Sequence, residues 1–114
     1  MSAAKHRLDF PTVIIDYNKL QSYGSTQEVM DPEPLLDKWC SFGFSVREVD
    51  GHDVDAMRKI LQELPLERGK PNAIVCHTIK GKGFPFAEGR AEWHHRSRFS
   101  KEEIQLMNVA LGLD

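Results

Sequence analysis

Short apolar segments alternate along this chain with segments of helical periodicity, and this alternation limits the fold more than any other feature. The apolar segments are rich in β-branched residues and are bounded by Gly, Pro or Asp, which is typical of strands. We expect strands at residues 12–16, 44–49 and 73–77. Because helical segments separate them, the order is β-α-β-α-β, which predicts a parallel sheet.

Capping residues mark both intervening helices. Asp31 can cap the first helix with Pro32 in its first turn, and Gly43 follows the apolar face of this helix. Asp53 can cap the second helix, whose apolar residues recur at helical spacing until Pro65. Each helix is therefore expected to cross from one strand to the next.

The remainder of the chain divides into a loop and a last helix. Residues 78–99 are rich in glycine, basic and aromatic residues without sustained periodicity, which predicts a long functional loop. A helix is expected from Ser100, where Glu103 completes a capping box. Its expected buried stripe consists of Ile104, Met107 and Leu111.

These elements predict an α/β fold with a partial parallel sheet of about three strands and flanking helices. Parallel sheets are normally covered on both faces and flanked by further strands. Residues 1–11 leave room for little more than a short helix. We therefore expect residues 1–114 to form a single partial domain, whose remaining strands come from another chain or segment.

Charge and cysteine content narrow the class of partner. The 114 residues carry a formal net charge of -2, which gives no attraction for nucleic acid or an anionic membrane. No apolar stretch is long enough to cross a bilayer, and residues 1–7 lack the apolar region of a signal peptide. Cys40 and Cys76 lie in separate apolar segments and are expected to be reduced core thiols. A cytoplasmic protein with small-molecule or protein partners is predicted.

The first predicted strand ends abruptly in carboxylate, amide and glycine. In open α/β sheets, ligands bind just beyond the carboxyl ends of the strands. Asp16 and Asn18 are therefore candidate oxygen ligands for a metal ion or a phosphate. An ordinary polar turn is the alternative, because Asp, Asn and Gly also dominate turns.

A basic glycine segment and a pair of histidines lie in the long loop. Lys80-Gly81-Lys82-Gly83 follows the third predicted strand, where backbone amides and ammonium groups could approach an anion. Its alternative is a solvated basic turn, and it lacks the spacing of a nucleotide-binding P-loop. His94 and His95 could exchange protons at neutral pH, although adjacent loop histidines are more often surface residues.

Four motifs carry a resemblance to a known family. They are Asp16-Tyr17-Asn18-Lys19-Leu20-Gln21, Glu48-Val49-Asp50-Gly51-His52-Asp53, His77-Thr78-Ile79-Lys80-Gly81-Lys82-Gly83 and Glu92-Trp93-His94-His95-Arg96. In this order and spacing they resemble transketolase. More narrowly, they resemble the later part of its thiamine-diphosphate-binding half, as found in split enzymes whose two halves are separate polypeptides.

The resemblance implies a cofactor site. Thiamine diphosphate would be held through Mg²⁺ or Ca²⁺, with the side-chain oxygen of Asn18 and the main-chain oxygen of Leu20 as metal ligands. Lys80 would lie in the loop over the cofactor. His95 aligns best with a family histidine near the cofactor and the transferred sugar, and His94 is the neighbouring alternative.

The resemblance also implies an assembly. The family's Gly-Asp-Gly metal motif should precede Asn18, yet residues 1–17 contain none. A site without that carboxylate should bind a hard dication weakly, so little cofactor affinity is expected from this polypeptide alone. We expect a component or fragment of a transketolase acting on sugar phosphates. It would be oligomeric and inactive without the missing segment and the pyrimidine-binding, C-terminal half.

Other interpretations stay open. Deoxyxylulose phosphate synthase and the α subunits of 2-oxo-acid dehydrogenases share the Asn element and the basic glycine loop. The amino-acid sequence of residues 17–21 and 93–95 favours transketolase. A hypothesis from a different class is a truncated relative that acts as a non-catalytic protein-interaction module, because the predicted sheet is incomplete.

Overall fold

The computed structural model describes residues 1–113, which group into two compact units. The first unit consists of residues 1–17 and 32–78, and the second consists of residues 18–31 and the chain from residue 79 onward. The parallel sheet lies in the first unit. The second unit holds a small hairpin, a long turn-rich segment and the last helix.

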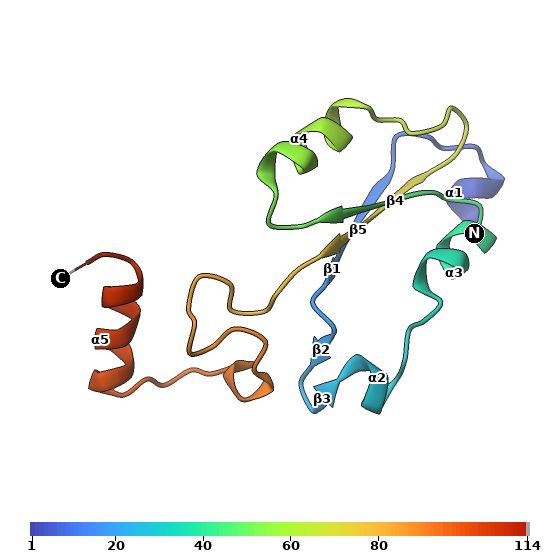
Figure 1. Ribbon diagram of the computed structural model, residues 1–114. Helices are drawn as coiled ribbons and strands as arrows, with labels where there is room; N and C mark the ends of the chain where they lie inside the picture. Colours follow the sequence, from blue (N-terminus) through green and yellow to red (C-terminus); the bar gives the residue numbers. More distant parts are fainter. Residues whose placement is uncertain (114) are drawn as a thin grey trace. The chain divides into compact units, whose positions relative to one another are not determined.

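The sheet has three parallel strands in the order β1-β5-β4 (Figure 1). Their bounds are β1 (Thr12–Tyr17), β4 (Ser45–Asp50) and β5 (Asn72–His77). Asn72 pairs with Thr12 on one side and with Ser45 on the other, so the three strands start level with one another. The predicted parallel sheet is confirmed, with strand bounds that differ by one residue.

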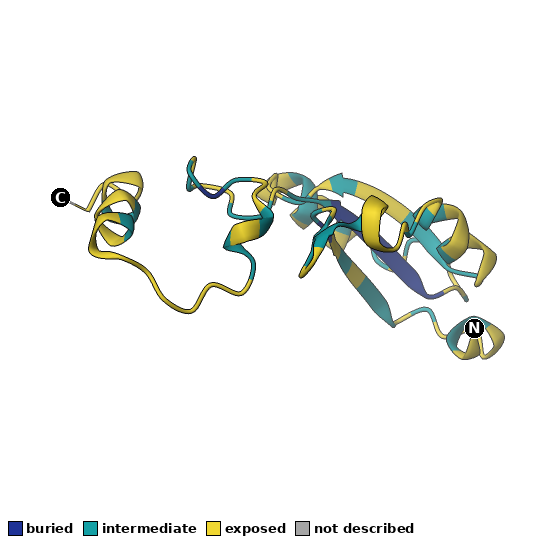
Figure 2. Cartoon of the chain, turned by 90° about the horizontal axis from the view of Figure 1, so that it is seen from below, coloured by how far each residue is buried: buried dark blue, intermediate teal, exposed yellow. Residues whose placement is uncertain are grey.

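Strand β5 forms the core, and its neighbours are edge strands. Figure 2 shows β5 as the buried strand between two partly exposed ones. Ile74 and Val75 are fully buried, whereas Ile14 of β1 is 53% exposed. A strand that is covered on both faces reads as a continuous apolar run, and Ala73, Ile74, Val75 and Cys76 of β5 form such a run.

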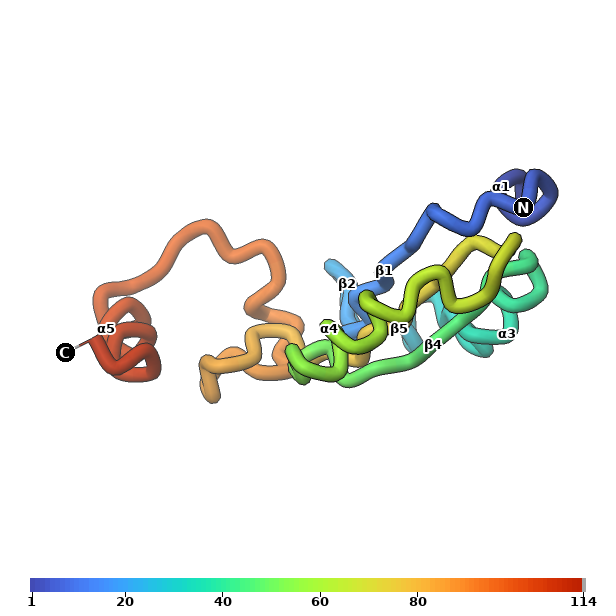
Figure 3. The backbone as a smooth tube through the Cα atoms, turned by 90° about the horizontal axis from the view of Figure 1, so that it is seen from above, coloured from blue at the N-terminus to red at the C-terminus, as the bar shows by residue number. Residues whose placement is uncertain are grey.

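Helix α4 (Val54–Gln62) packs on the sheet through Met57. The Asp53 carboxylate accepts a hydrogen bond from the backbone N–H of Ala56 at 2.9 Å, so the predicted cap is confirmed. The Cys76 thiol donates to the sulfur of Met57 over 3.6 Å. The helix therefore lies against the sheet beside β4 and contacts β5 through Met57, and Figure 3 shows it from above.

Helix α3 (Leu35–Ser41) begins later than the sequence indicates. The expected start at Asp31 is wrong: Pro34 is the residue before the helix, and a carboxylate oxygen of Glu33 accepts a hydrogen bond from the Leu35 N–H at 2.8 Å. Because a proline disfavours helical backbone at the residue before it, the helix cannot extend back through Glu33. The Glu33 side chain thus accepts the hydrogen bond of the first backbone N–H of the helix, that of Leu35.

The two cysteines differ in burial, and both are free thiols. Cys76 is buried in β5, and burial raises the pKa of its thiol, with a further contribution from the Asp16 carboxylate. Cys40 lies exposed on α3, so its predicted place in the core is wrong. The half-buried face of that helix is formed by Leu35, Leu36 and Trp39 instead.

The second unit is built from short elements. They are β2 (Leu20–Gln21), β3 (Gly24–Ser25), α2 (Thr26–Val29), the 3₁₀ helix η1 (Ala91–Trp93) and α5 (Lys101–Ala110). Strands β2 and β3 pair antiparallel as a hairpin. The sequence does not predict the hairpin or α2, because elements of two to four residues are too short to show a period.

Helix α5 begins as predicted but does not bury its apolar stripe. Its capping box is present: the Ser100 hydroxyl accepts from the Glu103 N–H at 3.2 Å, and the Glu103 carboxylate accepts from the Ser100 N–H at 2.8 Å. Ile104 is 47% exposed and Leu111 59% exposed, so the expected burial of that stripe is wrong. No helix within residues 1–113 has the length and apolar character needed to cross a membrane.

Also in the first unit, a buried asparagine ties β5 to two loops. Asn72 is fully buried, its Nδ2 donates to the carbonyl of Asp9 at 2.8 Å, and its Oδ1 accepts from the Leu66 N–H at 2.9 Å. Replacing it would leave both backbone groups without this partner inside the protein. The side chain therefore joins the segment before β1 to the loop before β5.

The substitution Asn72→Ala should lower the free energy of unfolding by about 2 to 3 kcal/mol, because two polar backbone groups lose their partner. Urea denaturation followed by circular dichroism measures this. Gln62→Ala, at an exposed position of α4, is the control and should stay within about 0.5 kcal/mol of the unaltered chain. Equal stability of Asn72→Ala and the unaltered chain would contradict the assigned role.

Candidate functional site

The carboxyl end of β1 is held by polar contacts within the first unit. Tyr17 is 8% exposed, and its hydroxyl donates to Glu33 over 2.6 Å. The Thr78 hydroxyl donates a short hydrogen bond to the carboxylate of Asp16. Nearby, Nε2 of His77 lies 2.8 Å from a carboxylate oxygen of Glu48. Asp16, a candidate ligand in the sequence, is thus engaged by the end of β5.

Asn18 directly follows β1 and forms a tight turn. Its side-chain Oδ1 accepts a hydrogen bond from the Leu20 N–H at 3.0 Å. Lys19 between them has φ +62°, and its carbonyl accepts from the Thr26 N–H at 2.9 Å. An Asn side chain that bonds the backbone two residues on is an Asx turn. Both expected metal ligands therefore lie within one turn, the side-chain amide of Asn18 beside the backbone of Leu20.

The side-chain oxygen of Asn18 and the backbone oxygen of Leu20 are the type of ligand that a hard cation prefers. An amide oxygen has two lone pairs, and Mg²⁺ and Ca²⁺ prefer oxygen ligands. Both donors are neutral, so the charge that holds such an ion must come from other groups. Within residues 1–113, no three His, Cys, Asp or Glu side chains gather closely enough to hold a metal ion.

The basic glycine segment folds into a closed loop. The Gly89 N–H donates to the carbonyl of Lys80 at 2.9 Å, which joins the two ends of the loop. Gly81 has φ +74°, and a Cβ there would lie 2.9 Å from the carbonyl oxygen of Ala87, so only glycine fits without a shift. Lys82 lies 3.6 Å from a carboxylate oxygen of Glu88.

The two histidines lie side by side in the second unit, and the charge of Lys80 acts on one of them. The rings of His94 and His95 meet edge to face with centroids 4.2 Å apart. Burial lowers the pKa of His94, and the nearby positive charges of Lys80 and His95 lower it further. The lowered pKa favours the neutral form of the His94 imidazole.

The two histidines differ in their surroundings. His94 is half-buried, and its Nδ1 is buried without a hydrogen-bond partner among the described residues. His95 is exposed and has φ +58°, a left-handed backbone conformation that is uncommon for any residue other than glycine. A shielded ring with an unsatisfied nitrogen is better prepared for proton exchange or ligand contact than an exposed one. The sequence offered His94 only as the alternative, because it carries no signal that separates neighbouring imidazoles by burial.

The lowered pKa of His94 predicts how the stability of the folded chain depends on pH. The unfolded chain protonates this residue near the ordinary value of about 6.5, whereas the folded chain protonates it at lower pH. The unfolded state therefore binds more protons just below pH 6.5, and the contribution of His94 to stability falls as pH falls through this window. It is restored as pH rises above it.

Urea unfolding of the chain between pH 5 and pH 8 tests this contribution. The substitution His94→Gln should make the dependence of stability on pH shallower below about pH 6.5. His6→Gln, at an exposed position, reports the effect of losing a histidine elsewhere. The assignment fails if His94→Gln and the unaltered chain show the same slope.

Comparisons with known proteins show the family to which the chain belongs. The family model described as transketolase, thiamine diphosphate binding domain, matches residues 1–114. A 6-deoxy-6-sulfo-D-fructose transketolase subunit from a Clostridium species is 43% identical over 95 residues, which cover 83% of this chain and 34% of that protein. An apulose-4-phosphate transketolase subunit from Phocaeicola vulgatus is 38% identical over 95 residues, with the same coverage of 83% and 34%. The chain thus spans about a third of the length of these relatives.

Solved structures give the same result. The transketolase of Campylobacter jejuni superposes with a TM-score of 0.84 at 26% identity, covering 99% of this chain and 17% of that one. The transketolase of Leishmania mexicana gives a TM-score of 0.83 at 30% identity, covering 99% and 17%. Together with the family match over the whole chain, these likenesses lead to one conclusion: the chain belongs to the transketolase family, within its thiamine diphosphate binding domain.

Proposed function

We propose that this chain forms part of a thiamine-diphosphate-dependent transketolase that moves a two-carbon ketol unit between sugar phosphates. The single observation that carries the proposal is the family match over residues 1–114. The Asx turn at Asn18 and the grouping of Lys80 with His94 support it. These features match what the binding of an anionic, metal-bound cofactor requires.

In this proposal Asn18 and Leu20 hold the divalent cation, Mg²⁺ or Ca²⁺, through the side-chain amide oxygen and the backbone carbonyl. Lys80 provides positive charge toward the diphosphate. The described donors fit a hard cation in type but supply no negative charge, and no Gly-Asp-Gly sequence occurs in the 114 residues. We therefore infer that these 114 residues alone bind the cofactor weakly and are inactive by themselves.

The bound cofactor would supply the carbanion chemistry of ketol transfer. The chain's own residues would orient it and exchange protons. The sequence assigned proton exchange to His95, but the partial burial of His94, its unpartnered Nδ1 and its lowered pKa favour His94 for this role. Because Lys80 and burial keep His94 neutral near pH 7, its imidazole can accept a proton from a substrate hydroxyl.

A second polypeptide is part of the proposal. The relatives above are named as transketolase subunits, and we infer a partner that carries the pyrimidine-binding, C-terminal half. Exposed apolar side chains on α5, which include Leu106 and Val109, support assembly into an oligomer. The free thiols of Cys40 and Cys76 are consistent with a reducing compartment, and we propose a cytoplasmic location for the assembly.

The exposed apolar side chains also favour a second candidate function, a non-catalytic module that binds the other half of a transketolase. The two candidates differ in one respect: only the enzyme component needs Asn18 and His94. Deoxyxylulose phosphate synthase activity is a third outcome, and it separates from ketol transfer by its decarboxylation of pyruvate.

A chimera tests the proposed function. In the apulose-4-phosphate transketolase subunit of P. vulgatus, the matched 95-residue segment is replaced by its counterpart from this chain. The chimera keeps the rest of the relative's sequence, including any metal-binding motif upstream of the exchanged segment. With the partner polypeptide, thiamine diphosphate and Mg²⁺, the chimera should transfer ketol units, whereas the 114-residue chain alone should show negligible cofactor binding by calorimetry.

Variants of the chimera assign the residues. Asn18→Ala should weaken cofactor and Mg²⁺ binding about tenfold or more, since a metal ligand is lost. His94→Ala should lower kcat by about a hundredfold or more, and His95→Ala should lower it less. Gln27→Ala, at an exposed position, is the control. A folded chimera without ketol transfer would contradict the proposed function. So would Asn18→Ala and His94→Ala variants that are as active as the unaltered chimera.

A further inference from the structure

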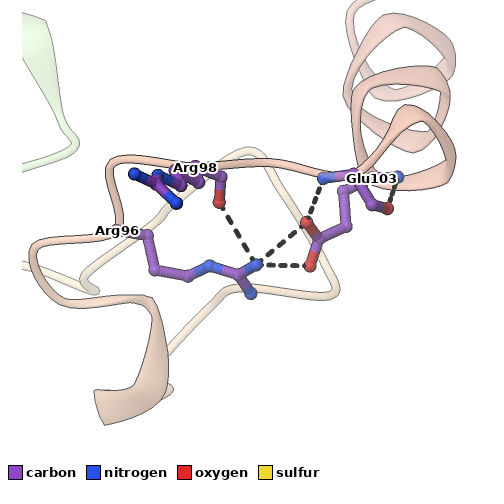
Figure 4. A network of polar contacts seen from close by, with 4 residues as sticks. Arg96, Arg98 and Glu103 are labelled. Atoms are coloured by element: carbon purple, nitrogen blue, oxygen red, sulfur yellow. Dashed lines mark hydrogen bonds and ion pairs between the residues drawn. The ribbon is translucent and has the colours of Figure 1, made fainter.

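The guanidinium of Arg96 is held from two sides, two residues after His94. It lies over the ring of Trp93, 4.4 Å from the ring centroid, and 5.8 Å from the centroid of Phe99. Its Nη2 donates to both carboxylate oxygens of Glu103, at 2.8 Å and 2.9 Å (Figure 4). An arginine held between an aromatic face and a carboxylate in this way uses both its planar surface and its donors.

The carboxylate in this pair is itself fixed. Glu103 closes the capping box at the start of α5, where it accepts from the Ser100 N–H at 2.8 Å. The side chains of Arg96 and Glu103 are 32% and 23% exposed, against 58% and 65% for the Arg90–Glu92 pair. A shielded pair with two hydrogen bonds holds its geometry, whereas an exposed pair contributes little.

The aromatic platform under Arg96 is fixed as well. Trp93 stacks on Phe99 with ring planes 16° apart, and Phe86 packs against the same indole with centroids 5.2 Å apart. Between Trp93 and Arg96, the left-handed backbone of His95 turns the chain back, which allows Arg96 to lie over Trp93. The pair of histidines therefore sits in a short loop that is secured at both ends.

We propose that Arg96 is a positioning residue: the Arg96 clamp, formed by Trp93, Arg96, Phe99 and Glu103, fixes the imidazole of His94 by joining its loop to the first turn of α5. Its catalytic consequence rests on the proposed function of His94. The contacts that form the clamp all lie within the second unit. In this proposal Arg96 acts by holding the loop that carries His94, without a contact to the substrate of its own.

Substitutions in the chimera and in the 114-residue chain test the clamp. Arg96→Gln should lower kcat about tenfold to a hundredfold with KM nearly unchanged, because a displaced imidazole slows the chemical step more than binding. In the 114-residue chain alone, NMR should show that Arg96→Gln moves the pH midpoint of the His94 titration toward the ordinary value of a histidine, because the ring is released to solvent. Arg96→Lys keeps the charge for Glu103 but loses the planar stacking, and should recover part of both effects.

Two further variants make the test decisive. Glu103→Gln should shift the His94 midpoint in the same direction as Arg96→Gln, and it stands in for that variant if Arg96→Gln fails to fold. Arg98→Gln is the matched control, because Arg96 contacts only the backbone carbonyl of Arg98, at 3.4 Å, and the substitution should leave kcat and the midpoint unchanged.

The clamp and the proposed function can fail separately. If Arg96→Gln and Glu103→Gln fold and leave the His94 midpoint where it was, the positioning role is overturned, whatever the activity. If the midpoint moves while the unaltered chimera shows no ketol transfer, the clamp holds and the proposed function fails.

Discussion

Strand β5 pairs along its whole length with both β1 and β4, and the arrangement of the first unit depends on this double pairing. The register sets Tyr17, His77 and Asp50 level with one another, so the three strands end at the same edge. The fully buried Asn72 at the start of β5 fixes the opposite end of the strand through the loops it holds. A shift of one residue would turn every side chain of β5 to the other face.

Much of the fold could be predicted because strong local signals agree with the tertiary structure. The β-branched run of β5, the Asp53 cap and the Ser100 capping box each appear where the sequence indicates. The start of α3 was wrong because Pro34 outweighs the capping tendency of Asp31. Periodicity also cannot tell whether a stripe such as that of α5 has a neighbour to cover it, and in this chain Ile104 stays exposed.

Candidate site residues could be named from the sequence only where a motif fixes a residue type. Asn18 and Leu20 came from such a motif, and the structure adds the Asx turn that places them side by side. The choice between His94 and His95 depends on burial and on the nearby Lys80, which no local pattern encodes. Arg96 and Glu103 are seven positions apart, and nothing in the sequence indicates that Trp93 would bring the arginine toward the helix.

The proposed role of the turn after β1 is to supply two neutral oxygen ligands to a metal ion that is completed by other parts of an assembly. Anomalous diffraction from crystals of the chimera, grown with thiamine diphosphate and Mn²⁺ in place of Mg²⁺, tests this role at the level of individual atoms. We expect a manganese peak within coordination distance of Asn18 Oδ1 and of the Leu20 carbonyl oxygen. A fully occupied manganese site that neither atom contacts would refute it.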